Sequence, residues 1–202
     1  MVMLAACGAG GSESERAPLC EVRPSSEEGA SLRKVLRGED FDTQISSSSE
    51  RFAEALEGEL RGMEPQKETL PEYACAFRPR AAVERATFGF GWAPRVSQGA
   101  ENPLPGGAPY AVNDAFGASS DTHTRMYIAC TLPGDLGERS KSAWLYADAS
   151  YTVNIGRTDV DQAARDRQTA LTYLMARRVT DALGCENKPL AEPPVVKPAA
   201  TP

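Results

Sequence analysis

The residue best suited to acid–base or nucleophilic chemistry is the single histidine of the chain, His123. It lies in a polar stretch with two serines and an aspartate, Ser119-Ser120-Asp121-Thr122-His123-Thr124. A serine-type hydrolase needs a nucleophile, an imidazole and a carboxylate that converge in space. However, the sequence has no G-x-S-x-G nucleophile elbow, and only Asp121 is close enough along the chain to share a metal ion with His123. We therefore interpret His123 as a surface residue.

Two clusters of carboxylates are a second place where chemistry could occur. They consist of Glu39, Asp40 and Asp42, and of Asp159, Asp161 and Asp166. A glycosidase uses two carboxyl groups that flank the scissile bond. Acidic residues near the start of a helix also interact favourably with the helix dipole without any catalytic role. We interpret both clusters in this second way, and we predict no catalytic residue, no cofactor and no metal ion.

The segment Phe88-Gly89-Phe90-Gly91-Trp92 alternates aromatic residues with glycine. A phosphate-binding loop needs a helix N-terminus after its glycines, whereas this alternation is typical of a strand with one aromatic and one nearly bare face. The bare face would let a ligand or another part of the backbone approach closely. We name Phe90, Trp92 and Trp144 as the walls of a candidate ligand groove, and a packed hydrophobic core is the alternative.

Cys7 follows Leu4-Ala5-Ala6 and precedes the flexible run Gly8-Ala9-Gly10-Gly11-Ser12. This arrangement resembles the lipobox of a bacterial lipoprotein, in which the cysteine carries the lipid. The apolar residues 1–4 then form the end of a signal segment whose front is missing, and the alternative is an ordinary cysteine near the N-terminus. No apolar run of about 18 residues occurs in the sequence. We therefore predict that lipid on Cys7 alone anchors the protein to the bilayer, on the outer face of the cell membrane.

The remaining cysteines are even in number: Cys20, Cys75, Cys130 and Cys185. In an exported protein such a set indicates two disulfides, and the spacing leaves all three pairings open. A structural zinc site would need close C-x2–4-C pairs, and no two of these cysteines lie that near each other.

The composition limits the partners of the chain. It has 202 residues, of which 41% are hydrophobic, and a net charge of −6. This length supports one domain with a core. The negative charge argues against nucleic acid and anionic lipid headgroups, because both favour Lys and Arg. We predict a tethered binding or interaction module for an envelope component or a protein partner, with a cell-envelope hydrolase of unrecognised active site as the alternative.

Helices are predicted near both ends of the domain. Capping boxes at Ser25 and Glu28 and at Ser47 and Glu50 indicate two helix starts. An apolar stripe from about residue 164 to 183, ended by Gly184, predicts a helix about 35 Å long. Strands are predicted from a period of two, over residues 73–79, 86–92, 110–116, 126–132 and 145–153.

This order of elements predicts the α+β class. We expect an antiparallel sheet of four to five strands, packed by an N-terminal helical segment and one long C-terminal helix. The predicted core combines Phe52, Leu56, Ile128, Leu145, Leu171 and Met175. Residues 1–7 would be the remnant of a lipoprotein signal peptide, 8–18 a flexible tether, 19–186 the single domain and 187–202 a Pro-rich disordered tail.

Several motifs together resemble a group of small actinobacterial (Streptomyces-type) secreted lipoproteins of uncharacterised function. They are the lipobox, Leu19-Cys20, the strand Tyr73-Ala74-Cys75 and the helix ending Ala182-Leu183-Gly184-Cys185-Glu186-Asn187. The resemblance implies an exported α+β domain with the disulfides Cys20–Cys75 and Cys130–Cys185. It carries no catalytic residue.

Overall fold

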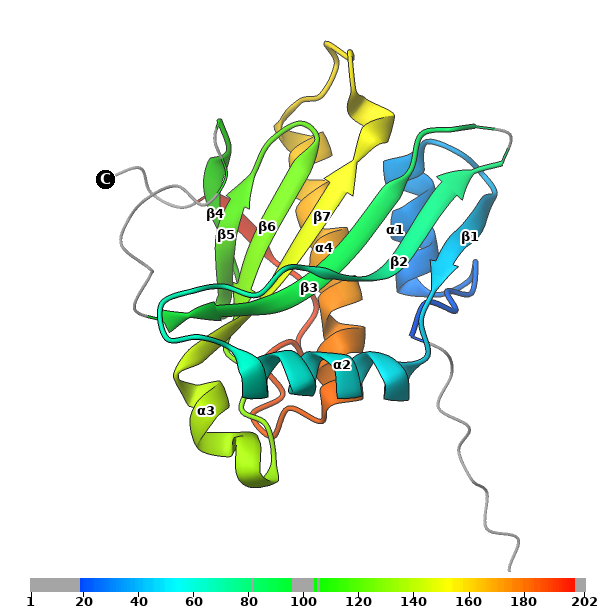
Figure 1. Cartoon of the computed structure of the whole chain (residues 1–202). Coiled ribbons are helices and arrows are strands. Elements are labelled where there is room, and N and C mark those ends of the chain that lie inside the picture. Colours follow the sequence, from blue (N-terminus) through cyan, green and yellow to red (C-terminus); the bar gives the residue numbers. More distant parts are fainter. Residues whose placement is uncertain (1–18, 81, 96–103, 105, 199–202) are drawn as a thin grey trace, which may run out of the picture.

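The computed structural model describes residues 19–80, 82–95, 104 and 106–198 (Figure 1). Its α-helices are α1 (Glu27–Leu36), α2 (Ser49–Gly62), α3 (Gly137–Lys141) and α4 (Gln162–Leu183). Its strands are β1 (Phe41–Ser46), β2 (Glu72–Pro79), β3 (Ala86–Pro94), β4 (Ala108–Val112), β5 (Ala115–Ser119), β6 (His123–Ile128), β7 (Ala143–Tyr151) and β8 (Val196–Pro198).

The strands form one antiparallel sheet in the order β1-β2-β3-β7-β6-β5-β4-β8. The α+β class and the antiparallel sheet are confirmed. The predicted four to five strands were too few, because the described residues contain eight strands and four α-helices.

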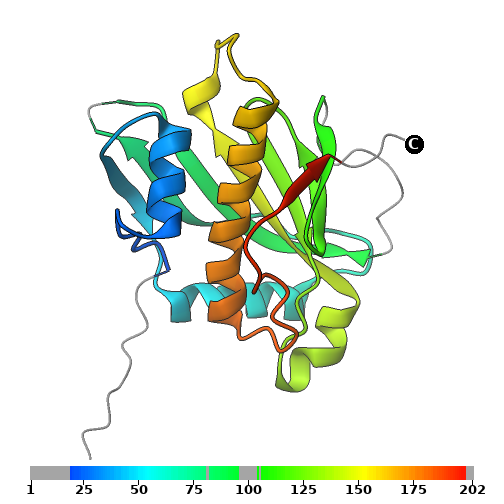
Figure 2. The same cartoon turned by 180° about the vertical axis from the view of Figure 1, so that it is seen from behind.

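The helices cover one face of the sheet. Helices α1 and α4 lie side by side on that face (Figure 2), and α2 crosses one end of the sheet (Figure 1). The six predicted core residues are each at most 2% exposed and belong to one cluster. The prediction of a shared core between the helices and the sheet is therefore confirmed.

Polar side chains determine where the helices begin, because the first N–H groups of a helix lack partners within it. Ser26 Oγ accepts from Gly29 N at 3.1 Å, and Ser48 Oγ accepts from Arg51 N at 3.4 Å. Asp161 Oδ1 accepts from Ala164 N at 2.8 Å to cap α4. Gly184, with φ of 67°, ends α4 as predicted.

Several segments differ between the sequence prediction and the structure. The strand predicted over residues 126–132 is β6, which begins earlier, at His123, and ends at Ile128. Residues 41–46 form β1, which the sequence did not reveal because this edge strand is polar and mostly exposed. Residues 110–116 are not one strand but the turn region of the β4–β5 hairpin. Part of the tail predicted to be disordered belongs to the domain, since Leu190 is 1% exposed and β8 pairs with β4.

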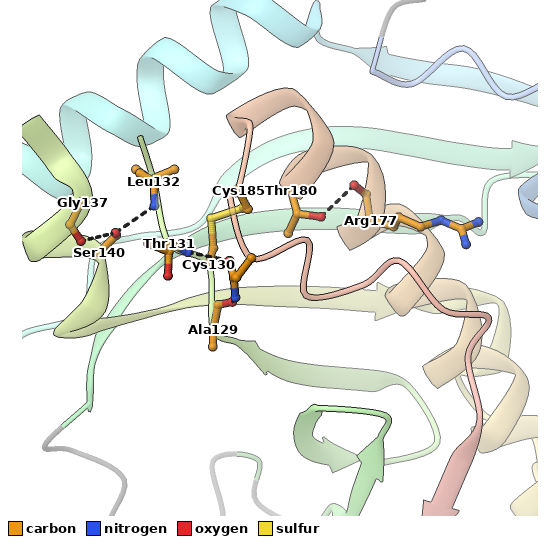
Figure 3. Close-up of a disulfide and its surroundings, with 10 residues drawn as sticks. Ala129, Cys130, Thr131, Leu132, Gly137, Ser140, Arg177, Thr180 and Cys185 are labelled. Carbon is orange, nitrogen blue, oxygen red and sulfur yellow. Dashed lines mark hydrogen bonds between the residues drawn. A yellow bond between two sulfur atoms is a disulfide. The ribbon is translucent and has the colours of Figure 1, made fainter. Parts of the chain in front are cut away.

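Two disulfides join the helical segments to the sheet, with the pairing that the resemblance implied. Cys20–Cys75 links the segment before α1 to β2, and Cys130–Cys185 links the chain after β6 to the end of α4 (Figure 3). Asn187 supports the second bridge, since its Oδ1 accepts from Thr131 N at 2.9 Å and its Nδ2 donates to Ala129 O at 2.6 Å. This region of the sheet therefore holds α4 both covalently and through hydrogen bonds.

We expect the double substitution Cys130→Ala/Cys185→Ala to lower the free energy of unfolding by about 2–5 kcal/mol, because the bridge restricts the unfolded chain. It closes a sequence separation of 55 residues. Urea unfolding of the oxidised protein measures the change. Glu186→Ala, which keeps the bridge, should change the stability by less than about 0.5 kcal/mol. Equal stability of the double variant and the wild type would contradict this prediction.

Candidate binding site on the open sheet face

The predicted groove residues lie on opposite faces of the sheet. Phe90 and Trp92 are 0% exposed on the helix-covered face, where the Phe90 ring packs against Phe52 at 5.9 Å and Trp92 Nε1 donates to Leu56 O at 2.8 Å. The alternation along β7 places Trp144 on the other face, which we call the open face (Figure 1). The prediction of a groove walled by all three residues is therefore wrong. Phe90 and Trp92 belong to a packed core, which was the alternative.

The bare face of β3 is occupied by the chain itself. Residues 64–71, between α2 and β2, run across the open face (Figure 1), and we call them the cross-sheet segment. Thr69 N donates to Trp92 O at 2.9 Å, and Thr69 Oγ1 accepts from Trp92 N at 3.0 Å. Tyr146 OH donates to Thr69 O at 2.7 Å. These bonds hold the segment on β3 and β7.

The glycines of β3 make this close approach feasible. A Cβ atom on Gly91 would lie 2.7 Å from both Thr69 Oγ1 and the Tyr146 hydroxyl, and one on Gly89 would lie 3.0 Å from Pro71 Cβ. The sequence predicted that either a ligand or another part of the backbone would approach this bare face. The structure shows another part of the backbone there.

Beside the cross-sheet segment, three rings form the aromatic cluster (Phe116, Tyr127 and Trp144). They come from the neighbouring strands β5, β6 and β7, and each is partly exposed. The Phe116 and Tyr127 rings stack with centroids 5.6 Å apart and an interplanar angle of 24°. Trp144 meets Phe116 edge to face at 5.2 Å and 88°. The cluster presents flat, partly apolar surfaces on a rigid sheet.

Two guanidinium groups lie against these rings. Arg95 Cζ is 4.2 Å from the centre of the Trp144 ring, and its Nε donates to Ala143 O at 3.1 Å. Arg125 Cζ is 4.3 Å from the centre of the Tyr146 ring and 5.7 Å from that of Tyr127. All three cation–ring distances are within the range of cation–π attraction, so the aromatic cluster is bordered by fixed positive charges.

Carboxylates hold Arg125 in place. Its Nη2 is 2.7 Å from Glu68 Oε2 on the cross-sheet segment, and its Nη1 is 3.7 Å from Asp148 Oδ2 on β7. Burial acts to lower the pKa of Arg125, but Tyr127 and Glu68 outweigh it and raise the pKa overall. Burial also raises the pKa of the Tyr127 and Tyr146 hydroxyls. Near neutral pH the guanidinium is therefore charged and both phenols are neutral.

Two buried donors of this region have no hydrogen-bond partner in the part of the chain that the structure describes. They are the indole N–H of Trp144 and the Nε–H of Arg125. Buried polar atoms in folded proteins usually have partners, and their lack of one calls for an explanation. A ligand oxygen at the aromatic cluster would supply such a partner.

The residues considered for catalysis are not joined in the way a catalytic triad requires. The His123 ring bonds through Nδ1 to Thr122 Oγ1 at 2.9 Å. Asp121 Oδ1 pairs with Arg165 at 2.7 Å, and Ser119 Oγ bonds to Thr124 Oγ1 at 3.0 Å. No hydrogen bond in the described residues connects the His123 ring to a carboxylate.

Three residues of the two acidic clusters, Asp40, Asp42 and Asp159, pair with arginines. Asp40 and Asp42 both lie near Arg80, with shortest N–O distances of 3.5 and 4.0 Å. Asp159 pairs with Arg37 at 2.9 Å and with Arg157 at 2.7 Å. The described residues contain no group of three or more His, Cys, Asp or Glu side chains that could hold a metal ion.

Sequence reasoning found one of the residues at this site, Trp144. It missed Tyr127 and Arg125, although the alternation that places Met126 and Ile128 in the core also places these two on the open face. Phe116 was missed because residues 110–116 were read as one strand, and Arg95 follows β3 without any periodic signal.

Comparisons of the chain with protein-family models, with curated proteins and with solved structures gave no match. Within the described residues, no helix combines the length and the apolar character that crossing a membrane requires. The predicted lipidation site, Cys7, lies outside the described residues.

We expect Gly91→Ala to lower the free energy of unfolding by about 1–3 kcal/mol, because the added methyl group would overlap Thr69 and Tyr146. Gly58→Ala is the matched control, since nothing lies within 4 Å of a Cβ at this position in α2. It should raise the stability by about 0.5–1 kcal/mol, as alanine favours a helix. Thermal unfolding compares the two variants, and equal melting temperatures would contradict the account of the cross-sheet segment.

Proposed function

We propose that this protein is a lipid-anchored binding module of the cell envelope, and that it binds a sugar-containing envelope component at the aromatic cluster. The observation that carries the proposal is the row of three partly exposed rings on adjacent strands, bordered by Arg95 and Arg125. Ligand sites commonly combine such apolar surfaces with a few placed polar groups.

The chemistry of a saccharide fits these groups. A sugar ring has an apolar C–H face, which can pack against the exposed parts of the Trp144 and Tyr127 rings, and a rim of hydroxyl groups. The rim oxygens accept hydrogen bonds from guanidinium and indole N–H groups, and the hydroxyl protons are donated to carboxylates such as Glu68. Arg95 has no carboxylate partner in the described residues, and its guanidinium N–H groups would donate to the sugar hydroxyls.

The disulfides support the location of the module. Two bridges indicate an oxidising environment outside the cytoplasm. Cys7 would carry the lipid and would hold the domain near the cell wall through the tether of residues 8–18.

The binding test uses sedimentation of the protein with purified cell-wall polysaccharide. We expect Trp144→Ala to weaken binding at least about tenfold, which corresponds to about 1.4 kcal/mol, because it removes the largest ring of the aromatic cluster and the ring that Arg95 contacts. Val83→Ala is the control, since Val83 is an 86% exposed apolar residue in the β2–β3 connection. Failure of the wild type to sediment with the polysaccharide, or an equal loss of binding in both variants, would refute saccharide binding at the aromatic cluster.

The anchor test uses metabolic labelling with a fatty-acid probe in cells that express the full-length gene product. We expect the wild type to take up the label and Cys7→Ala to lose it, because the thiol is the proposed attachment point. Labelling that persists in Cys7→Ala would contradict the anchor without affecting the saccharide site.

A further inference from the structure

A small pocket lies on the helix-covered side of the molecule, away from the aromatic cluster. It is formed where the end of α1 and the first turns of α4 meet the short helical turn Thr152–Asn154 (Figure 2). Its polar lining consists of Lys34, Arg37, Asn154, Arg167 and Gln168. Its cavity volume is about 10 Å³, which is room for about one water-sized atom.

Gln168 gives the pocket a buried acceptor. The residue is 1% exposed, and its Oε1 is buried without a hydrogen-bond partner in the part of the chain that the structure describes. Its Nε2 donates to Asp121 O at 3.0 Å, next to Asn154 Nδ2, which donates to the same oxygen at 2.9 Å. Because this carbonyl accepts from Nε2, the orientation of the amide is determined, and Oε1 is left for a donor from outside.

The mouth of the pocket carries an excess of positive charge. Lys34 and Arg167 are exposed and form no ion pair within the described residues. Arg37 pairs with Asp159, but Arg157 also bonds to that carboxylate, at 2.7 Å. The hydrogen bonds from Arg157 and Arg37 hold the pKa of Asp159 well below its ordinary value. This single carboxylate therefore leaves the cations of the mouth largely uncompensated.

We infer that this pocket binds inorganic phosphate, with a P–OH group donating to Gln168 Oε1 and the charged oxygens at Lys34, Arg37 and Arg167. The small volume admits one oxygen of the anion, and the other oxygens remain at the mouth among the cations. The ligand must be both anionic and a hydrogen-bond donor. Inorganic phosphate keeps a P–OH proton near neutral pH, whereas sulfate and phosphodiesters do not, and a phosphate monoester, with a second pKa of about 6, has mostly lost its proton at pH 7.

This acceptor gives the site its selectivity. A site that is built to accept a hydrogen bond discriminates strongly against an analogue without the donor, because its own buried group then stays unpaired. Phosphate and sulfate are similar in size and shape, so the pair isolates the contribution of Gln168. The inference does not rest on the saccharide site, which lies on the other face of the sheet.

The test is calorimetric titration of the full chain at pH 7 and constant ionic strength with inorganic phosphate, sulfate, glycerol 1-phosphate and dimethyl phosphate. We expect phosphate to bind at least about tenfold more tightly than sulfate or dimethyl phosphate. Glycerol 1-phosphate, which is mostly an unprotonated dianion at pH 7, should also bind more weakly than inorganic phosphate. Binding of glycerol 1-phosphate as tight as that of phosphate would contradict the hydrogen bond to Gln168. Sulfate binding equal to phosphate binding, or no binding of phosphate, overturns the inference.

Two variants and one control separate the site from general electrostatics. Lys34→Gln/Arg167→Gln should weaken phosphate binding at least about tenfold, whereas Lys67→Gln/Lys141→Gln, with the same change of charge outside the pocket, should leave it within about twofold. Gln168→Met keeps the length of the side chain and should bring the phosphate-to-sulfate preference close to one. Equal losses in the two double variants, or a preference that survives in Gln168→Met, would also overturn the inference.

Discussion

Strand β3 combines buried aromatic rings on one face with glycine on the other, and both faces of the sheet depend on this alternation. On the helix side, Phe90 and Trp92 fill the space under α2, and the indole N–H of Trp92 bonds to the helix carbonyl of Leu56. On the open side, Gly91 leaves room for Thr69 and Tyr146. A register shift of one residue would place rings where the cross-sheet segment lies and glycines in the core, so the pairing of β3 with β7 is strongly specified.

The disulfides extend this constraint to the ends of the domain. Cys75 lies on β2, next to β3, and holds the segment before α1, while Cys130 follows β6 and holds the end of α4. Helices α1 and α4 also contact each other through Arg177, which pairs with Glu27 at 2.9 Å. The helical layer is therefore attached to both halves of the sheet, and the phosphate pocket lies where α1 meets α4.

The sequence predicted those parts of the fold that have a strong period. The stripe of α4 and the alternation in β3 and β7 were read correctly, because burial on one side imposes the pattern. For β6 the buried positions were found, but the strand lies three to four residues earlier than predicted. The edge strand β1 buries little, and β8 has three residues in a Pro-rich segment, so neither carries a period that could be read. The candidate sites also depend on periodicity. Trp144 was found because it lies on a periodic strand. The positions of Arg95 and of the pocket beside Gln168 depend on contacts between distant segments, which a local sequence pattern does not reveal.

The cross-sheet segment also limits where a ligand can bind on the open face. It covers the part of β3 that carries Gly89 and Gly91, so the uncovered rings belong to β5, β6 and β7. Glu68 of the segment pairs with Arg125 of β6, and this ion pair is continuous with the ring contacts to Tyr127 and Tyr146. The position of Arg125 thus depends on a segment that the glycines of β3 allow to approach. Since strands, ion pairs and ring contacts already order these side chains, a ligand would bind without the entropic cost of arranging them.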